Sequence, residues 1–206
     1  TLNLGINECN GKYIARMDAD DIMHEDRLKR QYEIMEANQD VAVCGTYVEA
    51  FGLANGIIGY GNNYIDSPLL SLLPHNYIIH PSVMIRKSFI HHNNIRYQNY
   101  PYAEDYKMWE DIANADGKFY VIPEPLLKYR ISKGQVSNLN SATQIETALA
   151  IQTEILEILL KKNTYKKEWV DNLYYTMLEA NNDDLIDGPH IIKTFYNMLT
   201  AIKNKC

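Results

Sequence analysis

The run from Tyr13 to Asp21, with the sequence YIARMDADD, constrains the fold more than any other stretch of the chain. An apolar, strand-like segment delivers three carboxylates, Asp18, Asp20 and Asp21, to what should be the end of a strand. Carboxylate oxygens are hard ligands that suit Mg²⁺ or Mn²⁺, ions that complete their coordination with waters and substrate phosphates. The alternative is an acidic turn in which Asp caps the helix that follows.

The first two thirds of the chain alternate strand-like and helix-like segments, which predicts a mixed α/β layer around a central sheet. The expected helices span 1–11, 24–38, 68–73, 87–91 and 106–115, and the expected strands span 13–17, 41–45 (with 47–51 continuing it or pairing beside it), 82–86, 118–122 and 126–130. In the helix at 24–38, we expect Leu28, Ile34 and Met35 to be buried and Arg27 to face outward with the other charged residues.

After about residue 138 the pattern becomes helical throughout, with segments at 141–162, 166–180 and 189–203. We therefore divide the chain into an α/β part, 1–138, and a helical extension, 139–206. We expect the extension to pack on the α/β part. The alternatives are recognition of an acceptor and peripheral attachment to the inner face of a membrane.

The composition excludes several classes of protein. The net charge of −6 argues against a nucleic-acid partner, because nucleic-acid-binding proteins normally present a basic face. The three cysteines are widely spaced and form neither a metal-ligand pattern nor a disulfide framework, which favours a reducing cytoplasm. No stretch has the ~20 apolar residues of a membrane span, and the start has no signal-peptide pattern.

Several short motifs follow one another over roughly residues 1–137. They are Asn3-x-Gly5-Ile6, the run Gly11–Asp21, Arg27-Leu28 with Gln31, His80–Met84 with Arg86, Glu104-Asp105-Tyr106 with Trp109, and Tyr129-Arg130. In this order they resemble the family 2 glycosyltransferases of the GT-A fold. The sequence departs from the family at His24, where the family often has Pro.

The resemblance implies an inverting transfer of a sugar from a nucleotide-diphospho-sugar, most often a UDP-sugar, to the hydroxyl of a saccharide or lipid-linked acceptor. It points to bacterial polysaccharide or glycoconjugate synthesis. Asp18 and Asp20 match the family's metal motif, with Asp21 as a further ligand or a hydrogen-bond acceptor beside it. Asp105 matches the position of the general base, with Glu104 supporting it. The structural alternative is that both acids simply cap the helix that follows them.

Four further residues are weaker candidates for donor or acceptor binding. Arg16 either touches the substrate or pairs with the acidic cluster, and Arg130 either neutralises diphosphate charge or lies on the surface. His80 either contacts substrate or has a structural role before Pro81. Trp109 is a core residue or a platform for a sugar ring, and the core is favoured.

The family's first strands, which read the nucleotide base and ribose, have no counterpart in this sequence, so the expected fold is a partial GT-A sheet with helices on both faces. We expect the chain alone to be nearly inactive and its exposed sheet edges to favour a homodimer or strand exchange. Two other functions stay open. A nucleotidyltransferase should carry a glycine-rich basic phosphate loop, which is not visible here, and a non-catalytic interaction module would use the acidic turn only as a solvated cap.

Overall fold

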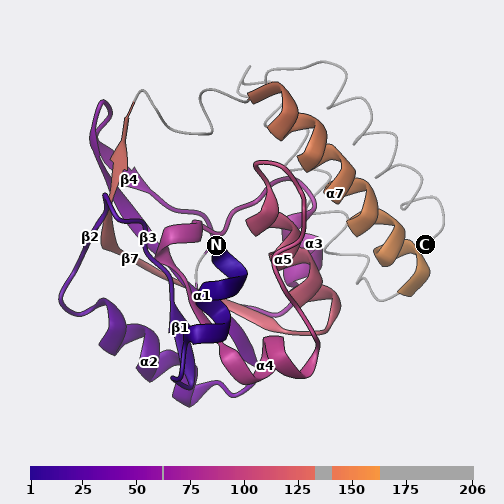
Figure 1. Ribbon diagram of the computed structural model, residues 1–206, viewed down its shortest axis with the longest axis horizontal. Coiled ribbons are helices and arrows are strands. Elements are labelled where there is room, and N and C mark those ends of the chain that lie inside the picture. The colour runs from indigo at the N-terminus through magenta and orange to yellow at the C-terminus, as the bar shows by residue number, and fades with distance from the viewer. Residues whose placement is uncertain (62, 133–140, 163–206) are drawn as a thin grey trace. The chain divides into compact units, whose positions relative to one another are not determined.

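The structure, a computed structural model, describes residues 1–61, 63–132 and 141–162. Thr1–Ile155 form one compact unit, and a second unit begins at Leu156. Figure 1 shows the described residues as a coloured ribbon with the helices and strands labelled where there is room. The helices expected at 166–180 and 189–203 lie outside the described residues. Within the described part of the chain, no helix is both long and apolar enough to cross a membrane.

Helices and strands alternate along the first unit, and the mixed α/β sheet expected from the sequence is confirmed. The helices are α1 (Leu2–Glu8), α2 (Arg27–Ala37), α3 (Pro68–Leu72), the 3-10 turn η1 (His80–Ser82), α4 (Lys87–His92), α5 (Glu104–Asn114) and α7 (Ser141–Lys162). The strands are β1 (Tyr13–Ala15), β2 (Ile22–Met23), β3 (Val41–Gly52), β4 (Gly56–Ile58), β5 (Asn63–Ile65), β6 (Met84–Arg86) and β7 (Lys118–Ile131).

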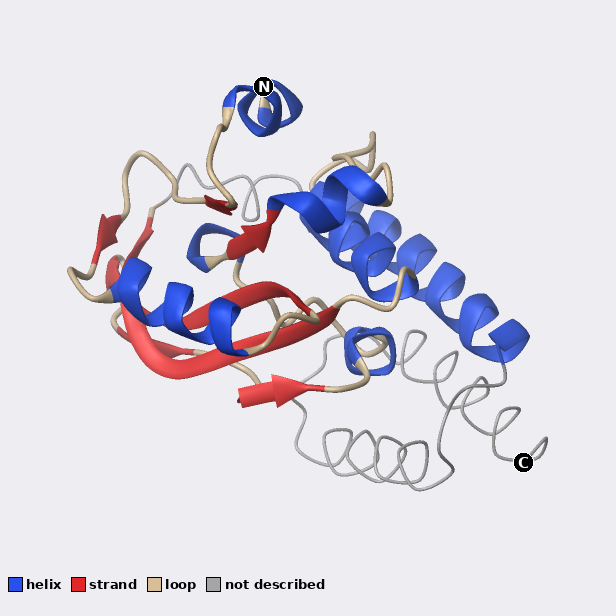
Figure 2. Cartoon of the chain, turned by 90° about the horizontal axis from the view of Figure 1, so that it is seen from below, coloured by secondary structure: helices blue, strands red, loops and turns tan. Residues whose placement is uncertain are grey.

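The sheet is built around β3 and β7, which pair in parallel along most of their length (Figure 2). The strand order is β1-β6-β3-β7-β2, with β4 added to β3 and β5 added to β7. All pairs other than β3 with β7 are antiparallel. This order places β1 beside β6 and β2 beside β7, so the acidic run between β1 and β2 crosses from one end of the strand order to the other.

Helix α2 covers one part of the sheet, and its buried face differs from the one we expected. Arg27, Gln31 and Met35 are all fully buried, whereas Leu28 is 41% exposed. These three residues are spaced by four and therefore share one helical face. The prediction that Arg27 faces outward and Leu28 inward is wrong, because buried carbonyl groups give the guanidinium hydrogen-bond partners inside the protein. Met35 is the apolar contact of this face and packs with Val41, Cys44, Met84, Ile122 and Leu126.

Helices α4 and α5 come close to the sheet at Gly117, which connects α5 to β7. A Cβ atom at Gly117 would lie 2.8 Å from side-chain atoms of both Ile112 in α5 and Phe89 in α4, and 2.9 Å from the Cβ of Ala42 in β3. Only glycine allows α5 to come this close to the strand that follows it. Helix α5 is thereby fixed against the sheet, and its N-terminus carries Glu104 and Asp105.

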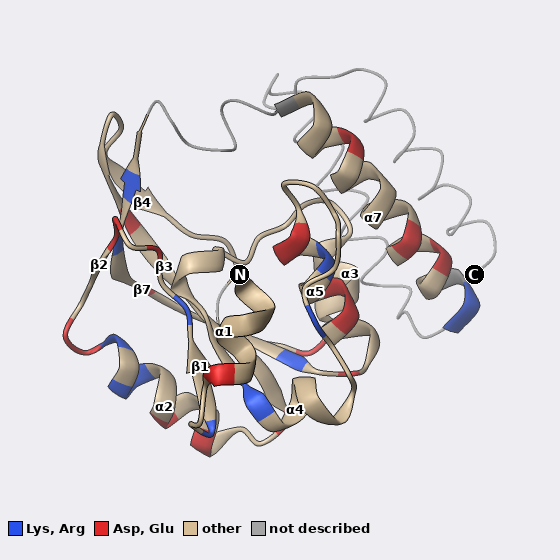
Figure 3. Cartoon of the chain, viewed as in Figure 1, with Lys and Arg blue, Asp and Glu red and all other residues tan. Residues whose placement is uncertain are grey.

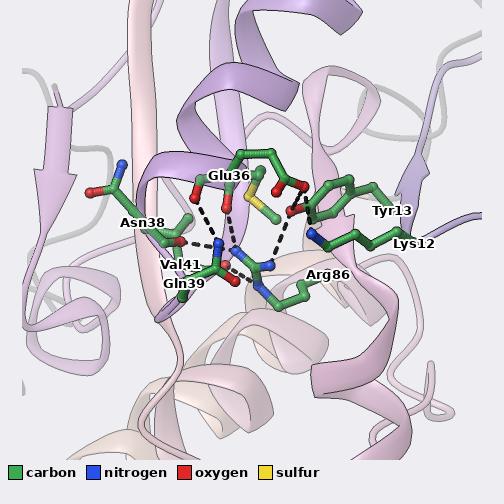
Figure 4. Close-up of polar contacts among 8 residues, drawn as sticks. Lys12, Tyr13, Glu36, Asn38, Gln39, Val41 and Arg86 are labelled. Carbon is green, nitrogen blue, oxygen red and sulfur yellow. Dashed lines mark hydrogen bonds and ion pairs between the residues drawn. The ribbon is translucent and has the colours of Figure 1, made fainter.

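Arg86 fixes the end of α2 to the sheet (Figure 4). Its guanidinium donates hydrogen bonds to the carbonyl oxygens of Met35 at 2.7 Å, Asn38 at 2.9 Å and Val41 at 2.9 Å. It also donates to the hydroxyl of Tyr13 at 3.1 Å. The last carbonyls of a helix have no partner within the helix, so a buried arginine here satisfies groups that would otherwise be costly. The Arg86 of the sequence motif therefore has a structural role.

Candidate functional site

The acidic turn begins where β1 ends, beside the segment that leads into β6. The backbone N–H of Arg16 donates to the carbonyl of Val83 at 2.9 Å, which extends the pairing of β1 with β6 by one residue. The N–H of Asp21 then donates to the carbonyl of Asp18 at 3.3 Å and closes the turn. The strand and the turn that the sequence predicts here are therefore present, although β1 ends at Ala15.

Arg27, which is buried beneath the start of this turn, is hydrogen-bonded to its backbone. Its Nη2 donates to the carbonyl of Arg16 at 2.6 Å and to that of Val83 at 3.2 Å, while its Nε donates to Oε1 of Gln31 at 3.1 Å. Gln31 in turn donates to the carbonyls of Cys44 at 2.6 Å and Ser82 at 2.9 Å. This pair joins α2 to β1, β3 and η1, so it positions the start of the acidic turn. Sequence reasoning missed this role because hydrophobic periodicity places charged residues outside.

Two of the three carboxylates of the turn are accessible. Asp18 forms a bidentate ion pair with Arg16, at 2.8 and 2.9 Å, and its side chain is 42% exposed. The side chain of Asp20 is 57% exposed, and its Oδ2 lies 3.9 Å from Nε of Arg130. Arg16 thus pairs with the acidic cluster, one of the two roles that the sequence left open for it.

Asp21 is buried and holds β7 to the turn. Its Oδ1 accepts the backbone N–H of Arg130 at 2.9 Å, while Arg130 Nε donates to the carbonyl of Asp20 at 3.1 Å. Burial raises the pKa of Asp21, and the charges of Asp18 and Asp20 add to this shift, whereas the bond from Arg130 opposes it. The Oδ2 of Asp21 is buried without a hydrogen-bond partner among the described residues.

The donor set of this turn fits a hard divalent cation. Asp18 and Asp20 offer two accessible carboxylates within one turn, and Asp21 adds a buried oxygen without a partner among the described residues. In the described ranges of the chain, no three His, Cys, Asp or Glu residues converge as a ready-made metal cage. Mg²⁺ in phosphate-transferring sites is commonly held by one or two carboxylates plus substrate phosphates, and this turn can supply that number.

The second predicted element, Asp105, lies in the first turn of α5. Its Oδ1 accepts the backbone N–H of Tyr106 at 2.7 Å, and its Oδ2 accepts the side-chain amide of Asn76 at 3.0 Å. Burial raises the pKa of Asp105 to about 6, and the neighbouring charge of Glu104 also raises it, while the two hydrogen bonds lower it. A carboxyl group with this pKa is ionised at neutral pH yet basic enough to accept a proton.

Asp105 lines a pocket of about 270 Å³. The walls come from the segment around Asn76, from Tyr102 and Ala103 ahead of α5, and from Gln144 and Ile145 of α7. All of these residues belong to the first compact unit. The sequence did not single out Asn76 or Gln144, because a lone side-chain amide carries no motif.

His80 and Trp109 connect η1 to α5. The Nε2 of His80 lies 2.8 Å from the hydroxyl of Tyr97, and the rings of His80 and Trp109 pack in a T-shaped arrangement with a centroid distance of 5.8 Å. Burial, together with the charge of Arg16, lowers the pKa of His80 to about 3, so the imidazole is neutral. Trp109 is fully buried and is a core residue, the favoured alternative from the sequence.

Arg16 lies within electrostatic reach of both acidic sites. Its positive charge acts on the pKa of Asp21 in the turn and on that of Asp105 in α5. It also acts on the pKa of His80, which contacts α5 through Trp109. Figure 3 shows the charged residues of α5 and of the segment ahead of β2. Arg16 therefore contacts Asp18 directly and also slightly lowers the pKa of Asp105 through its charge.

Comparison with known proteins relates this chain to glycosyltransferases. The family model described as glycosyl transferase family 2 matches residues 1–92. A Haemophilus influenzae protein described as an uncharacterized glycosyltransferase is 35% identical over 79% of this chain and 53% of its own length. The O-antigen biosynthesis glycosyltransferase WbnJ of Escherichia coli is 30% identical over 79% of this chain and 63% of its own length. The amylovoran biosynthesis glycosyltransferase AmsE of Erwinia amylovora is 27% identical over 85% of this chain and 65% of its own length.

A solved structure shares the fold. The crystal structure of Staphylococcus aureus TarS residues 1–349 in complex with UDP-GlcNAc superposes with a TM-score of 0.54 at 14% identity, over 85% of this chain and 59% of that chain. The chain therefore spans less than two thirds of the length of TarS 1–349 and of each of the three bacterial relatives.

Proposed function

We propose that the chain forms part of an inverting, metal-dependent glycosyltransferase, because residues 1–92 match the family model described as glycosyl transferase family 2. This enzyme transfers a sugar from a nucleotide-diphospho-sugar to the hydroxyl group of an acceptor. The observation that carries the proposal is the carboxylate of Asp105 at the wall of a pocket, where hydrogen bonds from Asn76 and from the backbone of Tyr106 fix its orientation.

Asp105 is the general base of the proposed reaction. A sugar hydroxyl is a poor nucleophile, and a carboxylate that accepts its proton during attack makes the oxygen more reactive. Oδ1 and Oδ2 of Asp105 already accept one hydrogen bond each, from Tyr106 and Asn76, and these bonds fix the orientation of the carboxylate. Each carboxylate oxygen can accept a further bond, so the acceptor hydroxyl can be held as well. Burial is the main cause of the raised pKa of Asp105, and the negative charge of Glu104 adds to it.

Asp18 and Asp20 are the residues that would hold Mg²⁺ or Mn²⁺, with Asp21 as a third oxygen donor or as an anchor of the turn. When bound, such an ion neutralises the negative charge that develops on a departing diphosphate. Arg16 and Arg130 border the same turn and add positive charge to it. Arg27 and Gln31 keep the turn in place from the protein interior.

Similarity to other proteins supports a proposal for the donor and the pathway. The TarS structure was solved with UDP-GlcNAc, and AmsE and WbnJ are named for the synthesis of amylovoran and O-antigen. We therefore assign this chain a UDP-sugar donor and a saccharide or lipid-linked acceptor in the assembly of a bacterial polysaccharide.

Mn²⁺ binding, measured by electron paramagnetic resonance, tests the proposed metal ligands. We expect Asp18→Asn and Asp20→Asn each to weaken binding of Mn²⁺ in the presence of UDP by about tenfold or more, since each removes a charged ligand. Asp26→Asn is the matched control, because Asp26 is an exposed acid outside the turn. Equal affinity in all three variants would instead favour a non-catalytic module in which the acidic turn is only a cap.

Loss of sugar transfer tests the proposed base. Asp105→Asn keeps the shape of the side chain but cannot accept a proton, so we expect transfer to fall by about 10²–10⁴-fold with unchanged binding of UDP. The rate is measured as radiolabelled sugar passed from the donor to an acceptor extract. Transfer at the wild-type rate by this variant would remove Asp105 from the mechanism.

A further inference from the structure

The pocket beside Asp105 has one wall made by α7, a helix that follows the α/β part of the chain. Gln144, Ile145 and Ala148 of this helix line the pocket together with Asn76. Ile145 is 47% exposed although it is aliphatic. An exposed aliphatic residue at the wall of a concave site is available for contact with a ligand.

Hydrogen bonds fix this wall on both sides of Asp105. Gln152 donates its side-chain amide to the carbonyl of Pro74 at 2.9 Å, two residues before Asn76. Gln144 donates to the carbonyl of Tyr102 at 2.9 Å, three residues before Asp105. Tyr102 has a φ of +62°, a left-handed backbone conformation that non-glycine residues adopt uncommonly. The bond from Gln144 therefore holds a strained loop at the edge of the pocket, which is typical of functional sites.

The lining of the pocket selects one chemical class of ligand. Among the described residues that line it, none is Lys or Arg, so this lining offers no cation to a phosphate. Instead it presents side-chain amides from Asn76, Gln144 and Gln152 beside the apolar surfaces of Tyr102 and Ile145. Amides bond hydroxyl groups, and apolar surfaces cover the C–H face of a ring. The volume of about 270 Å³ lies near the lower end of the roughly 300–1,000 Å³ of ligand sites, which suits a single ring.

We propose that this pocket binds the terminal, uncharged sugar unit of the acceptor, and that Gln144 and Ile145 of α7 determine which sugar is accepted. Gln144 bonds a hydroxyl group of the ring and keeps Tyr102 in place, while Ile145 covers an apolar face. Asp105 lies at the same wall and receives the proton of the attacking hydroxyl. The last step rests on the proposed function, whereas recognition of the sugar by α7 does not.

Ligand-detected NMR of the full chain tests this site with defined probes. The probes are the para-nitrophenyl glycosides of glucose, galactose and N-acetylglucosamine, with glucose 1-phosphate as the charged comparison. We expect at least one neutral glycoside to bind and glucose 1-phosphate to bind at least tenfold more weakly. Gln144→Ala and Ile145→Arg should each weaken the bound glycoside about tenfold, because one removes a polar contact and the other blocks the apolar surface.

Glu146→Gln is the matched control, because Glu146 is an exposed residue of the same helix that does not line the pocket. Binding should stay at the wild-type level in this variant. Circular dichroism shows whether Ile145→Arg alters the fold. If it does, the milder variant Ile145→Ser replaces it in the binding test. Failure of every neutral glycoside to bind, preference for glucose 1-phosphate, or unchanged binding in both α7 variants would overturn the proposal.

Hydrolysis of UDP-sugars without an acceptor separates this inference from the proposed function. UDP release depends on the acidic turn and does not need the α7 wall. The protein could bind a glycoside through α7 and yet release no UDP from any donor. This result would support the sugar-binding pocket and contradict the proposed function. If both α7 variants released UDP at wild-type levels and bound the glycoside as tightly as the wild-type protein, the proposed function would stand and the role of Gln144 and Ile145 in the pocket would be rejected.

Discussion

Asn76 donates a hydrogen bond from its side-chain amide to Oδ2 of Asp105 over 3.0 Å. The Oδ1 of the same amide accepts the backbone N–H of Ile78 at 3.1 Å, so Asn76 is itself fixed by the segment that leads into η1. The candidate base is therefore held by a residue from a distant part of the sequence, and its protonation should depend on that residue.

Removal of Asn76 should shift the pH dependence of transfer. Burial raises the pKa of Asp105 to about 6, and the bond from Asn76 lowers it by favouring the charged form. We expect kcat/KM of the wild-type protein to rise with pH through about 6, as the base becomes ionised. Asn76→Ala should move this midpoint upward by about one pH unit, because a hydrogen bond to a charged group contributes about 1.5 kcal/mol or more.

Asn99→Ala is the matched control for this measurement, since Asn99 is an exposed residue of the loop ahead of α5. Its pH profile should coincide with that of the wild-type protein. A midpoint that stays in place in Asn76→Ala, with only a lower plateau, would mean that Asn76 supports the fold and does not tune the base.

Asp105→Asn should stabilise the protein while abolishing transfer. The pKa of Asp105 is about 6 in the folded state and close to 3.9 in an unfolded chain, so the folded state binds more protons between these values. The free energy of unfolding therefore decreases as the pH rises from about 4 to about 6. At pH 7 the neutral amide avoids this cost, but its NH2 group cannot accept one of the two hydrogen bonds that the carboxylate accepts, so we expect a net gain of about 1 kcal/mol. Urea unfolding at pH 4 and pH 7 measures it, and an equal effect at both pH values would contradict the prediction.

Arg16→Gln should increase the affinity of the nucleotide-free protein for Mn²⁺. The guanidinium of Arg16 pairs with both oxygens of Asp18 and so competes with a cation for this carboxylate. We expect about a fivefold increase, the size of a partly exposed ion pair. Arg30→Gln is the control, because Arg30 pairs with Glu124 outside the acidic turn. Unchanged or weaker binding of Mn²⁺ in Arg16→Gln would contradict competition between Arg16 and the cation for Asp18.

Local patterns were sufficient to predict the acidic turn and the sheet that carries it. The apolar run ahead of Asp18 forms β1, and residues 41–51 form most of β3. The two strands expected at 118–122 and 126–130 are instead one continuous strand, β7, because the prolines between them are accommodated by register shifts within the strand and do not end it. The predicted roles of Asp18, Asp20 and Asp105 in binding and catalysis, the domain boundary at 138 and a homodimer stay predictions.

Contacts between distant residues could not be predicted in this way. Hydrophobic periodicity predicted that Arg27 faces solvent. Its guanidinium instead lies in the protein interior, where it donates hydrogen bonds to the carbonyl groups of Arg16 and Val83. The partner of Asp105 is Asn76, and the pocket wall comes from Gln144, residues whose approach depends on how α5 and α7 fold back. A sequence pattern indicates which residues of one helix or strand share a face. A functional site is formed where faces of several helices and strands meet, and the pattern does not show which of them meet.

Arg27→Lys should destabilise the protein although the charge is kept. The planar guanidinium bonds two carbonyl groups and the side chain of Gln31 at once, and an ammonium group cannot reproduce this geometry. We expect a loss of about 2–4 kcal/mol in the free energy of unfolding, because buried carbonyl groups lose their partners. Arg30→Lys, three positions along the same helix and exposed, should change it by less than about 0.5 kcal/mol. Similar values for the two variants would contradict a positioning role of Arg27 beneath the acidic turn.

Lys107 joins α5 to α7 and should control the attachment of the pocket wall. Its ammonium group pairs with Glu110, with Asp111 at 3.2 Å and with Glu154 of α7 at 2.7 Å. Although burial opposes its charge, the bonds to Glu110 and Glu154 raise the pKa of Lys107 above its ordinary value. Lys107→Met would leave Glu110, which is only 1% exposed, without its counter-charge. We expect a loss of about 3 kcal/mol or more, the range found when one partner of a buried ion pair is removed.

Hydrogen exchange separates a local effect of Lys107→Met from a global one. If Lys107 fixes α7, amides of residues 144–155 should exchange faster than those of β3 and β7 in this variant. Glycoside binding should weaken together with this exchange, while Mn²⁺ binding at the acidic turn stays unchanged. Lys118→Met is the matched control, because Lys118 pairs with Asp66 at the start of β7, away from α7. Uniformly faster exchange across the sheet and α7 in Lys107→Met would show that Lys107 stabilises the whole unit, in which case α7 is not separately attached through this ion-pair network.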